Sequence, residues 1–236
     1  MNVTSFSSAI VSSNSNGYLT VIPDIKCHSP KEGDLLLGRD PVEIAKSLVD
    51  CGAPALSVVT ETKNFGGSLE LLRNITNAVN VPVLRKDFIT DSVMLEETAE
   101  HGAAAALLLC THMKEDNLFR LYDAALALGI EPVVEVHNEA EMDMAKRIKA
   151  RLIAINNRNI LELEKDNGGP ERTIFLSSYA PSEAVLISAS GISSRGEAAL
   201  LAKTGVHSIL VGTALWLSKD ICETYNSFRV ERKVLL

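Results

Sequence analysis

The chain contains few aromatic residues, no long apolar run and no signal-like segment at its start. Aromatic side chains make up 5% of the 236 residues although 46% are hydrophobic, so we expect a core of Ala, Val, Leu and Ile. Parallel α/β proteins have such cores, because their strands are buried on both faces. No run of eighteen apolar residues and no basic segment followed by an apolar one occurs, which predicts a cytoplasmic protein that binds no membrane.

Cysteine and histidine occur, but not in the patterns that bind metals. The four cysteines, Cys27, Cys51, Cys110 and Cys222, form no Cys-x-x-Cys pair, so we interpret them as small buried hydrophobic residues in a reducing compartment. None of the five histidines has His-Glu-x-x-His spacing, which predicts no metal site. No Gly-rich dinucleotide loop follows an early strand, so we expect neither a cofactor nor an open doubly wound sheet.

The net charge also excludes one class of partner. A formal charge of −7 argues against nonspecific binding to nucleic acid, because that binding needs an excess of positive charge. A locally positive pocket for a small anionic substrate remains compatible with this charge.

Short apolar runs alternate with helical patterns along the chain. The predicted strands cover residues 19–26, 55–60, 81–86, 103–109, 131–136, 152–156, 185–189 and 207–211, and a helical segment follows each of them. Eight such units without a linker predict a single (β/α)8 TIM barrel over residues 19–230. The preceding residues 1–18 are rich in Ser and Asn, and we expect a flexible lead-in with at most a turn or two of helix.

Polar residues stand where several predicted strands end. Lys26, Lys86, Glu135 and Asn156 each close an apolar run or lie one residue from its end. In a barrel of parallel strands the carboxyl ends form one rim, and that rim carries the chemistry. The sequence therefore predicts an active site formed from these side chains.

Two glycine turns predict a phosphate site on the same rim. Ser190-Gly191 follows the seventh predicted strand, and Gly212-Thr213 follows the eighth. Barrels commonly bind phosphate at these two positions, through bare backbone N–H groups and a helix N-terminus. We therefore expect a phosphorylated small molecule as the ligand.

Several motifs together resemble one family of enzymes. They are Ile25-Lys26 followed by Ser29-Pro30, Thr60-Glu61 with Phe65 and Gly67-Ser68, Val83 to Phe88, Glu135 to Glu139, Ile155 to Asn159, Ser190-Gly191-Ile192, and Val211 to Leu215. In this order, over residues 20–217, they resemble indole-3-glycerol phosphate synthase. That family closes a ring in 1-(2-carboxyphenylamino)-1-deoxyribulose 5-phosphate and releases carbon dioxide and water, in tryptophan biosynthesis.

The resemblance implies a role for each residue. Lys86 resembles the general acid for the ketone oxygen, and Lys26 the lysine that holds the substrate carboxylate and assists proton transfer. Glu135 resembles the carboxylate that moves protons in dehydration, and Asp24 stands at a further catalytic position. The implied substrate-binding residues are Ser29, Pro30, Phe65, Phe88, Asn156, Arg158 and Ser190, with Gly191, Gly212 and Thr213 at the phosphate. Phe65 is expected to be exposed on its loop.

Three positions depart from the family pattern. Asp24 and Ala189 stand where the family usually has Glu, and Lys31 stands where it usually has Ser. Losing a carboxylate changes how the active-site lysines are paired, and thereby their proton affinity. Two alternatives therefore stay open: a related barrel enzyme that acts weakly or on another sugar phosphate, through a Schiff base for example, and a non-catalytic ligand-binding relative. Monomer or small homo-oligomer, and contacts with other tryptophan-pathway enzymes, also stay open.

Overall fold

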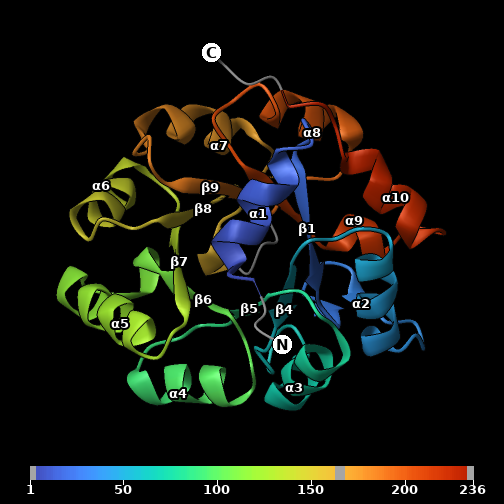
Figure 1. Cartoon of the computed structure of the whole chain (residues 1–236), viewed down its shortest axis with the longest axis horizontal. Coiled ribbons are helices and arrows are strands. Elements are labelled where there is room, and N and C mark those ends of the chain that lie inside the picture. Colours follow the sequence, from blue (N-terminus) through green and yellow to red (C-terminus); the bar gives the residue numbers. More distant parts are fainter. Residues whose placement is uncertain (1–3, 163–167, 233–236) are drawn as a thin grey trace.

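The protein is a closed barrel of parallel strands surrounded by helices (Figure 1). The computed structural model describes residues 4–162 and 168–232. Within these residues the barrel strands are β1 (Thr20–Ile25), β4 (Leu56–Val59), β5 (Val83–Lys86), β6 (Ala105–Leu109), β7 (Glu131–Val136), β8 (Leu152–Asn156), β9 (Val185–Ala189) and β10 (Ser208–Val211). They follow one another around the barrel in chain order, and β1 closes it by pairing with both β4 and β10. The predicted (β/α)8 barrel is confirmed.

Most of the helices begin where the sequence supplies a side-chain cap. The helices are α1 (Phe6–Asn14), α2 (Pro41–Asp50), α3 (Leu69–Ala78), α4 (Ser92–Glu100), α5 (Glu115–Ala127), α6 (Glu139–Arg147), α7 (Glu171–Leu176), α8 (Arg195–Leu201), α9 (Thr213–Trp216) and α10 (Ile221–Phe228). Asp40 accepts a hydrogen bond from the Val42 amide ahead of α2. Ser194 and Glu197 form a reciprocal capping box at α8. Such caps satisfy N–H groups that have no partner within the helix.

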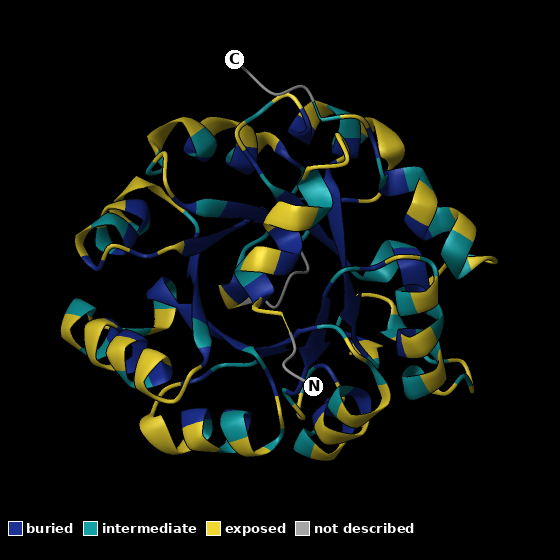
Figure 2. Cartoon of the chain, viewed as in Figure 1, coloured by how far each residue is buried: buried dark blue, intermediate teal, exposed yellow. Residues whose placement is uncertain are grey.

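The strands are buried on both faces, as parallel strands between helices must be (Figure 2). Side chains alternate along each strand, so one set packs against the helices and the other fills the barrel. Val58 and Ile153 belong to the outer layer, whereas Leu84, Leu107 and Ala189 belong to the inner one. The inner layer makes the barrel a packed core rather than a channel.

Helix α1 lies across the amino-terminal end of the barrel (Figure 1). Phe6 and Ile10 are fully buried and pack against the inner layer. The Thr20 hydroxyl donates to the Ile10 carbonyl, and the Ser7 amide donates to Glu131 on β7. The expected flexible lead-in is therefore wrong for this segment, because two large apolar side chains have a barrel end to fill.

The cysteines also differ from expectation. Cys51, which follows α2, forms a disulfide with Cys222 on α10, with a Cα–Cα distance of 5.8 Å. Barrel closure brings α2 and α10 together although 171 residues separate the two cysteines. The interpretation of all four as unpaired small hydrophobic residues is therefore wrong for this pair. Cys110 is a buried free thiol, and Cys27 is a partly exposed one.

We expect Phe6→Ala to lower the free energy of unfolding by about 3–5 kcal/mol, because it empties a fully buried site at the end of the core. Val11→Ala is the matched control, since Val11 lies on the same helix with half of its side chain exposed, and its effect should stay within about 0.5 kcal/mol. Chemical denaturation measures both values. Equal, small effects would show that α1 is not part of the core.

Candidate active site

Two cavities open at the carboxyl ends of the barrel strands. The larger has a volume of about 520 Å³ and is lined mainly by residues that follow β1, β9 and β10. The smaller has a volume of about 20 Å³ and is lined by residues at the ends of β4, β5, β6 and β7. The structure thus divides the predicted site residues into two groups, one around each cavity.

The turn after β9 is a glycine turn of restricted geometry. Ser190 and Gly191 both have left-handed backbone conformations, with φ of 60° and 69°. A Cβ atom on Gly191 would lie 2.2 Å from the Gly168 carbonyl oxygen, so only glycine fits there. Across the same cavity, a Cβ on Gly212 would lie 3.2 Å from the Asp24 Cβ. Ser190, Gly191, Gly212 and Thr213 therefore line one cavity, where they were predicted to bind phosphate.

A buried amide holds the Ser190-Gly191 turn in place. Asn157 donates from Nδ2 to the Ala189 and Ser190 carbonyls at 3.1 and 3.0 Å. Its Oδ1 accepts from the Thr173 amide and hydroxyl. The sequence analysis missed Asn157, although it lies next to Asn156, because its role depends on contacts with two later elements.

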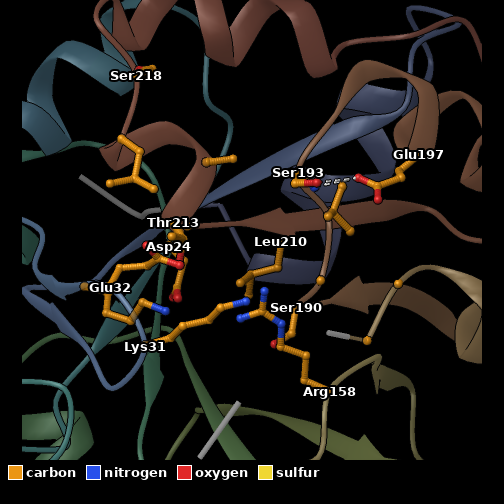
Figure 3. A pocket seen from close by; sticks show the side chains of 18 residues that line it. Asp24, Lys31, Glu32, Arg158, Ser190, Ser193, Glu197, Leu210, Thr213 and Ser218 are labelled. Atoms are coloured by element: carbon orange, nitrogen blue, oxygen red, sulfur yellow. Dashed lines mark hydrogen bonds between the residues drawn. The ribbon is translucent and has the colours of Figure 1, made fainter. Parts of the chain in front are cut away.

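The charges around the larger cavity have both signs. Arg158, Lys31 and Lys26 line it together with Asp24 and Glu197. Figure 3 shows the Arg158 side chain directed into the cavity on the side of Ser190. Lys31 comes from the hairpin of β2 (His28–Ser29) and β3 (Gly33–Asp34), the loop that follows β1. Three cations beside two glycine turns suit an anionic group such as phosphate.

Glu197 is already bound to the start of α8. Its Oε2 accepts from the amides of Ser193 and Ser194 at 2.7 and 2.9 Å. Burial alone would raise the pKa of Glu197, but these hydrogen bonds outweigh it and the pKa is lowered. These two amides are therefore occupied, which leaves the backbone at Gly191 and Gly212 as the anion-facing part of the cavity.

Asp24 is fixed at the carboxyl end of β1. Its Oδ1 accepts from the Ser57 hydroxyl at 2.7 Å, and its carbonyl oxygen accepts from the Trp216 indole N–H. Ala189 is buried in the inner layer, with no carboxylate at that position. At one of the two positions where the family usually has Glu, an aspartate thus accepts a hydrogen bond from a hydroxyl on β4. The other position carries an apolar side chain.

The smaller pocket brings two lysines to one aromatic ring. Lys26 Nζ lies 5.6 Å and Lys86 Nζ 6.0 Å from the centroid of Phe65, within the range of cation–π contacts. Lys86 lines this pocket together with Phe65, Phe88 and Glu135. Both lysines are buried, with relative exposures of 4% and 8%. The lysines are therefore part of the site and not solvated loop residues.

Phe65 is buried, with a relative exposure of 3%, so the expectation of an exposed aromatic is wrong. Glu61 turns the loop inward, because its Oε2 accepts from the amides of Asn64 and Phe65. The His28 amide then donates to the Phe65 carbonyl, which joins this loop to the hairpin after β1. Phe88 is half-buried, and the centroid of its ring lies 5.2 Å from the centroid of the His112 ring.

Asn156 connects the smaller pocket with Arg158. Its Nδ2 donates to Glu135 Oε1 at 3.1 Å, and its Oδ1 accepts from the Arg158 amide at 3.0 Å. Asn156 is completely buried, and Glu135 is almost completely buried. A buried carboxylate needs such donors, since an unpaired charge there would be costly.

Three predicted residues lie outside both cavity linings: Asn156, which reaches the smaller pocket through Glu135, and the two hairpin residues Ser29 and Pro30. Ser29 is buried, and its hydroxyl oxygen accepts from the amides of Lys31 and Glu32 at 3.4 Å each, so it shapes the hairpin. Pro30 is half-buried in the same turn. The structure places these two next to the site rather than on its walls.

Other lining residues were missed by the sequence analysis. They are Leu107, Leu109 and Ile160 around the smaller pocket, and Ile192, Ser193, Leu210, Ala214, Leu217 and Ser218 around the larger one. Leu107 and Leu109 alternate along β6, a signal that could have placed them inside the barrel. Leu210 lies in β10 and could have been placed inside the barrel in the same way, whereas the others depend on the geometry of loops and short helices that no local pattern reveals. His137 was part of a quoted motif but received no role.

Neither a metal site nor a membrane span is found in the described part of the chain. Across residues 4–162 and 168–232, no group of three or more His, Cys, Asp and Glu side chains could hold a metal ion. Among the same residues, no helix combines the length and hydropathy needed to cross a bilayer.

The fold and these two cavities are those of a barrel enzyme whose strand ends carry two buried lysines next to a pair of glycine turns. A family model described as indole-3-glycerol phosphate synthase matches residues 1–228. The chain therefore belongs to the indole-3-glycerol phosphate synthase family.

Individual relatives agree with this assignment. The chain is 38% identical over 214 residues to the indole-3-glycerol phosphate synthase of Streptococcus sanguinis, covering 91% of this chain and 82% of that protein. It is 38% identical over 208 residues to the Pyrococcus furiosus enzyme of the same name, covering 88% and 90%. The similarity to the Thermococcus kodakarensis enzyme of that name is 40% over 200 residues, covering 85% and 87%.

Gly212→Val should weaken the binding of inorganic phosphate and of ribulose 5-phosphate at least tenfold, about 1.4 kcal/mol, because its branched side chain enters the anion-facing side of the larger cavity. Gly205→Val is the matched control, since a Cβ there meets no atom within 4 Å and φ is not left-handed. Isothermal titration calorimetry compares the three proteins. Unchanged affinity in Gly212→Val would place the phosphate elsewhere.

Proposed function

We propose that this protein catalyses the indole-3-glycerol phosphate synthase reaction at the two cavities described above. The observation that carries the proposal is that the Nζ atoms of Lys26 and Lys86 lie 5.6 and 6.0 Å from the centroid of the Phe65 ring, with Glu135 in the small pocket that Lys86 and Phe65 line. The glycine turns after β9 and β10 lie around the adjacent cavity. A substrate with an aromatic carboxylate at one end and a phosphate at the other suits both cavities at once.

Binding uses opposite ends of the substrate. The phosphate would lie against the turns of Gly191 and Gly212, with Thr213 and Arg158 beside it. The aromatic ring would lie against Phe65 and Phe88 in the smaller pocket. Lys26 lines the larger cavity and also approaches Phe65, so it can hold the ring carboxylate where the two cavities meet.

The chemistry then needs acids and a base at fixed positions. Lys86 protonates the ketone oxygen as the aryl carbon attacks the carbonyl carbon, which neutralises the developing oxyanion. Loss of carbon dioxide restores the aromatic ring. In the dehydration step, Glu135 takes the proton from carbon, and the hydroxyl leaves as water with a proton from Lys26. Asn156 holds Glu135 and orients the substrate hydroxyls.

A second candidate function follows from the altered carboxylates. Asp24 has a shorter side chain than the Glu of the family pattern and is held by Ser57, and Ala189 supplies no carboxylate at its position. Such a site suits a related amino-deoxyketose phosphate, with a lysine forming a Schiff base to its carbonyl. Borohydride trapping of a lysine adduct in the presence of substrate would distinguish this activity from the synthase reaction.

The cellular location, the oligomeric state and the partners of the protein also stay predictions. A cytoplasmic location, a monomer or small homo-oligomer, and contacts with other tryptophan-pathway enzymes are all compatible with a small biosynthetic barrel enzyme. Ultracentrifugation would settle the oligomeric state.

Lys86→Met should lower kcat on carboxyphenylamino-deoxyribulose phosphate by a factor of at least about 100, because it removes the general acid. Binding of ribulose 5-phosphate should stay within about tenfold, since the loss acts mainly on the transition state. Lys203→Met, at an exposed lysine, is the control and should match wild type. Equal losses in binding and rate would make Lys86 a ground-state anchor instead.

Restoring the family carboxylates should raise turnover. We expect Asp24→Glu combined with Ala189→Glu to increase kcat on the family substrate by more than the two single changes added together, because both carboxylates act on one lysine network. Ala189→Gln is the matched neutral control, with melting temperatures measured for every variant because Ala189 is buried. A double variant that folds but is no faster than wild type would show that the missing carboxylates do not limit the enzyme.

A further inference from the structure

A chain of three titratable side chains leads from helix α6 to the smaller pocket. Glu141 Oε2 lies 3.0 Å from His137 Nδ1, and His137 Nε2 lies 3.6 Å from Glu135 Oε1. Glu135 lines the pocket, whereas Glu141 and His137 keep 13% and 10% of their side chains exposed. The roles assigned above use only the inner member of this chain.

The proton of the neutral imidazole belongs on Nδ1. Glu141 Oε2 also accepts from the His137 backbone amide at 2.8 Å, and the Thr111 hydroxyl donates to Oε1 at 2.9 Å. An ionised carboxylate can only accept, so the contact between Glu141 and Nδ1 requires N–H on the imidazole side. Burial alone would raise the pKa of Glu141, but its hydrogen bonds with His137 and Thr111 lower it, which keeps this carboxylate ionised.

The opposite nitrogen then faces Glu135 with a lone pair. Nε2 of His137 is buried and makes no hydrogen bond to any described residue. With Nδ1 protonated, the Nε2 lone pair and Glu135 Oε1 repel each other across the 3.6 Å gap. One additional proton on either atom turns this repulsion into a charge-assisted hydrogen bond. The geometry is therefore suited to a proton shared by Glu135 and His137.

The surrounding groups set the charge of this cluster. His137 faces Glu135 from β7, Glu141 from α6, and Thr111 from the 3-10 helix η1 (Cys110–His112). Burial raises the pKa of the Cys110 thiol, and Glu141 and Glu135 raise it further, so the thiol stays neutral. Lys86 on β5 lines the pocket beside Glu135, and Asn156 on β8 donates to it.

We propose that His137 is a positioning residue that shares a proton with Glu135 and passes it through Glu141 to solvent. The inference deepens the proposed function and rests on it, because it gives Glu135 a path for the proton that dehydration releases. Glu135 takes the proton from the substrate carbon, and the C–H electron pair stays in the substrate and expels the hydroxyl. That group leaves as water with a proton from Lys26, which solvent restores. The Glu135 proton moves to Nε2, and the Nδ1 proton moves to Glu141 and then to water. Once the product has left, water in the open pocket takes the Nε2 proton and solvent returns a proton through Glu141 to Nδ1, which restores the starting tautomer.

Kinetics test the relay through its pH dependence. His137→Asn keeps a donor near the Nδ1 position, and His137→Gln places an amide near Nε2, but neither side chain titrates. We expect kcat to fall about tenfold or more in both, with KM within about threefold. The acidic limb of the kcat profile should move to higher pH by at least half a unit, because a protonated His137 no longer keeps Glu135 ionised. Glu139→Gln, on the exposed face of α6, is the control and should match wild type in both respects.

A merely structural role gives a different result. His137 variants that lose kcat while the pH profile keeps its shape, or that match wild type throughout, would overturn the relay. Circular dichroism and ribulose 5-phosphate binding check that the variants fold and keep the larger cavity intact.

NMR tests the shared proton without any turnover. The imidazole nitrogens of His137 should take up a proton at a lower pH in Glu135→Gln than in wild type, by about one unit, because an anionic neighbour is removed. Glu139→Gln should leave the titration unchanged. An unchanged titration in Glu135→Gln overturns the inference even if the enzyme is active. A shifted titration in a protein without synthase activity retains the proton pair and rejects the proposed function.

Discussion

Buried charge at the carboxyl ends of the strands is the constraint on which the site depends. Lys26, Lys86 and Glu135 all lie at the ends of apolar strands, with little access to water. Charges in such positions are costly unless they have partners. The ring of Phe65 faces both ammonium groups, and Asn156 donates to the glutamate. These contacts hold the charges in fixed positions, where they can act on a bound substrate rather than be screened by solvent.

The two cavities impose different demands on a ligand. The larger has a rigid turn at Ser190 and Gly191, and Asn157 ties the carbonyls of that turn to the barrel. The smaller is lined mostly by apolar side chains, with Lys86 and Glu135 among its charged ones. A ligand that fills both must have an anionic end and an aromatic end, which is the shape that the synthase reaction requires. Of the two departures from the family pattern, Asp24 lines the larger cavity next to Gly212, and Ala189 is buried in the inner layer of the barrel.

The sequence predicted the features that local rules determine. Asp40 and Ser194 are typical N-cap residues, and they predicted where their helices begin. The parallel arrangement of the strands predicted that Lys86 and Glu135 lie on one rim of the barrel. Features that depend on tertiary contacts were missed. The Ser-rich start conceals the burial of Phe6, and the inward position of Phe65 depends on Glu61.

Long-range pairings show the same limit. Cys51 and Cys222 meet only because closure of the barrel brings α2 against α10. His137 gains its role from Glu141, which reaches it from the first turn of α6. No pattern within a single strand or helix contains this information, since it arises from how neighbouring elements pack.

The most direct test of the account is the wild-type reaction itself. The protein is mixed with carboxyphenylamino-deoxyribulose phosphate, and the indole product is followed by its fluorescence, with released carbon dioxide measured in parallel. The account predicts that indole glycerol phosphate and carbon dioxide form in equal amounts, over many turnovers per protein molecule. Tight binding of the substrate without either product would contradict it, and would leave a protein that only binds phosphorylated ligands.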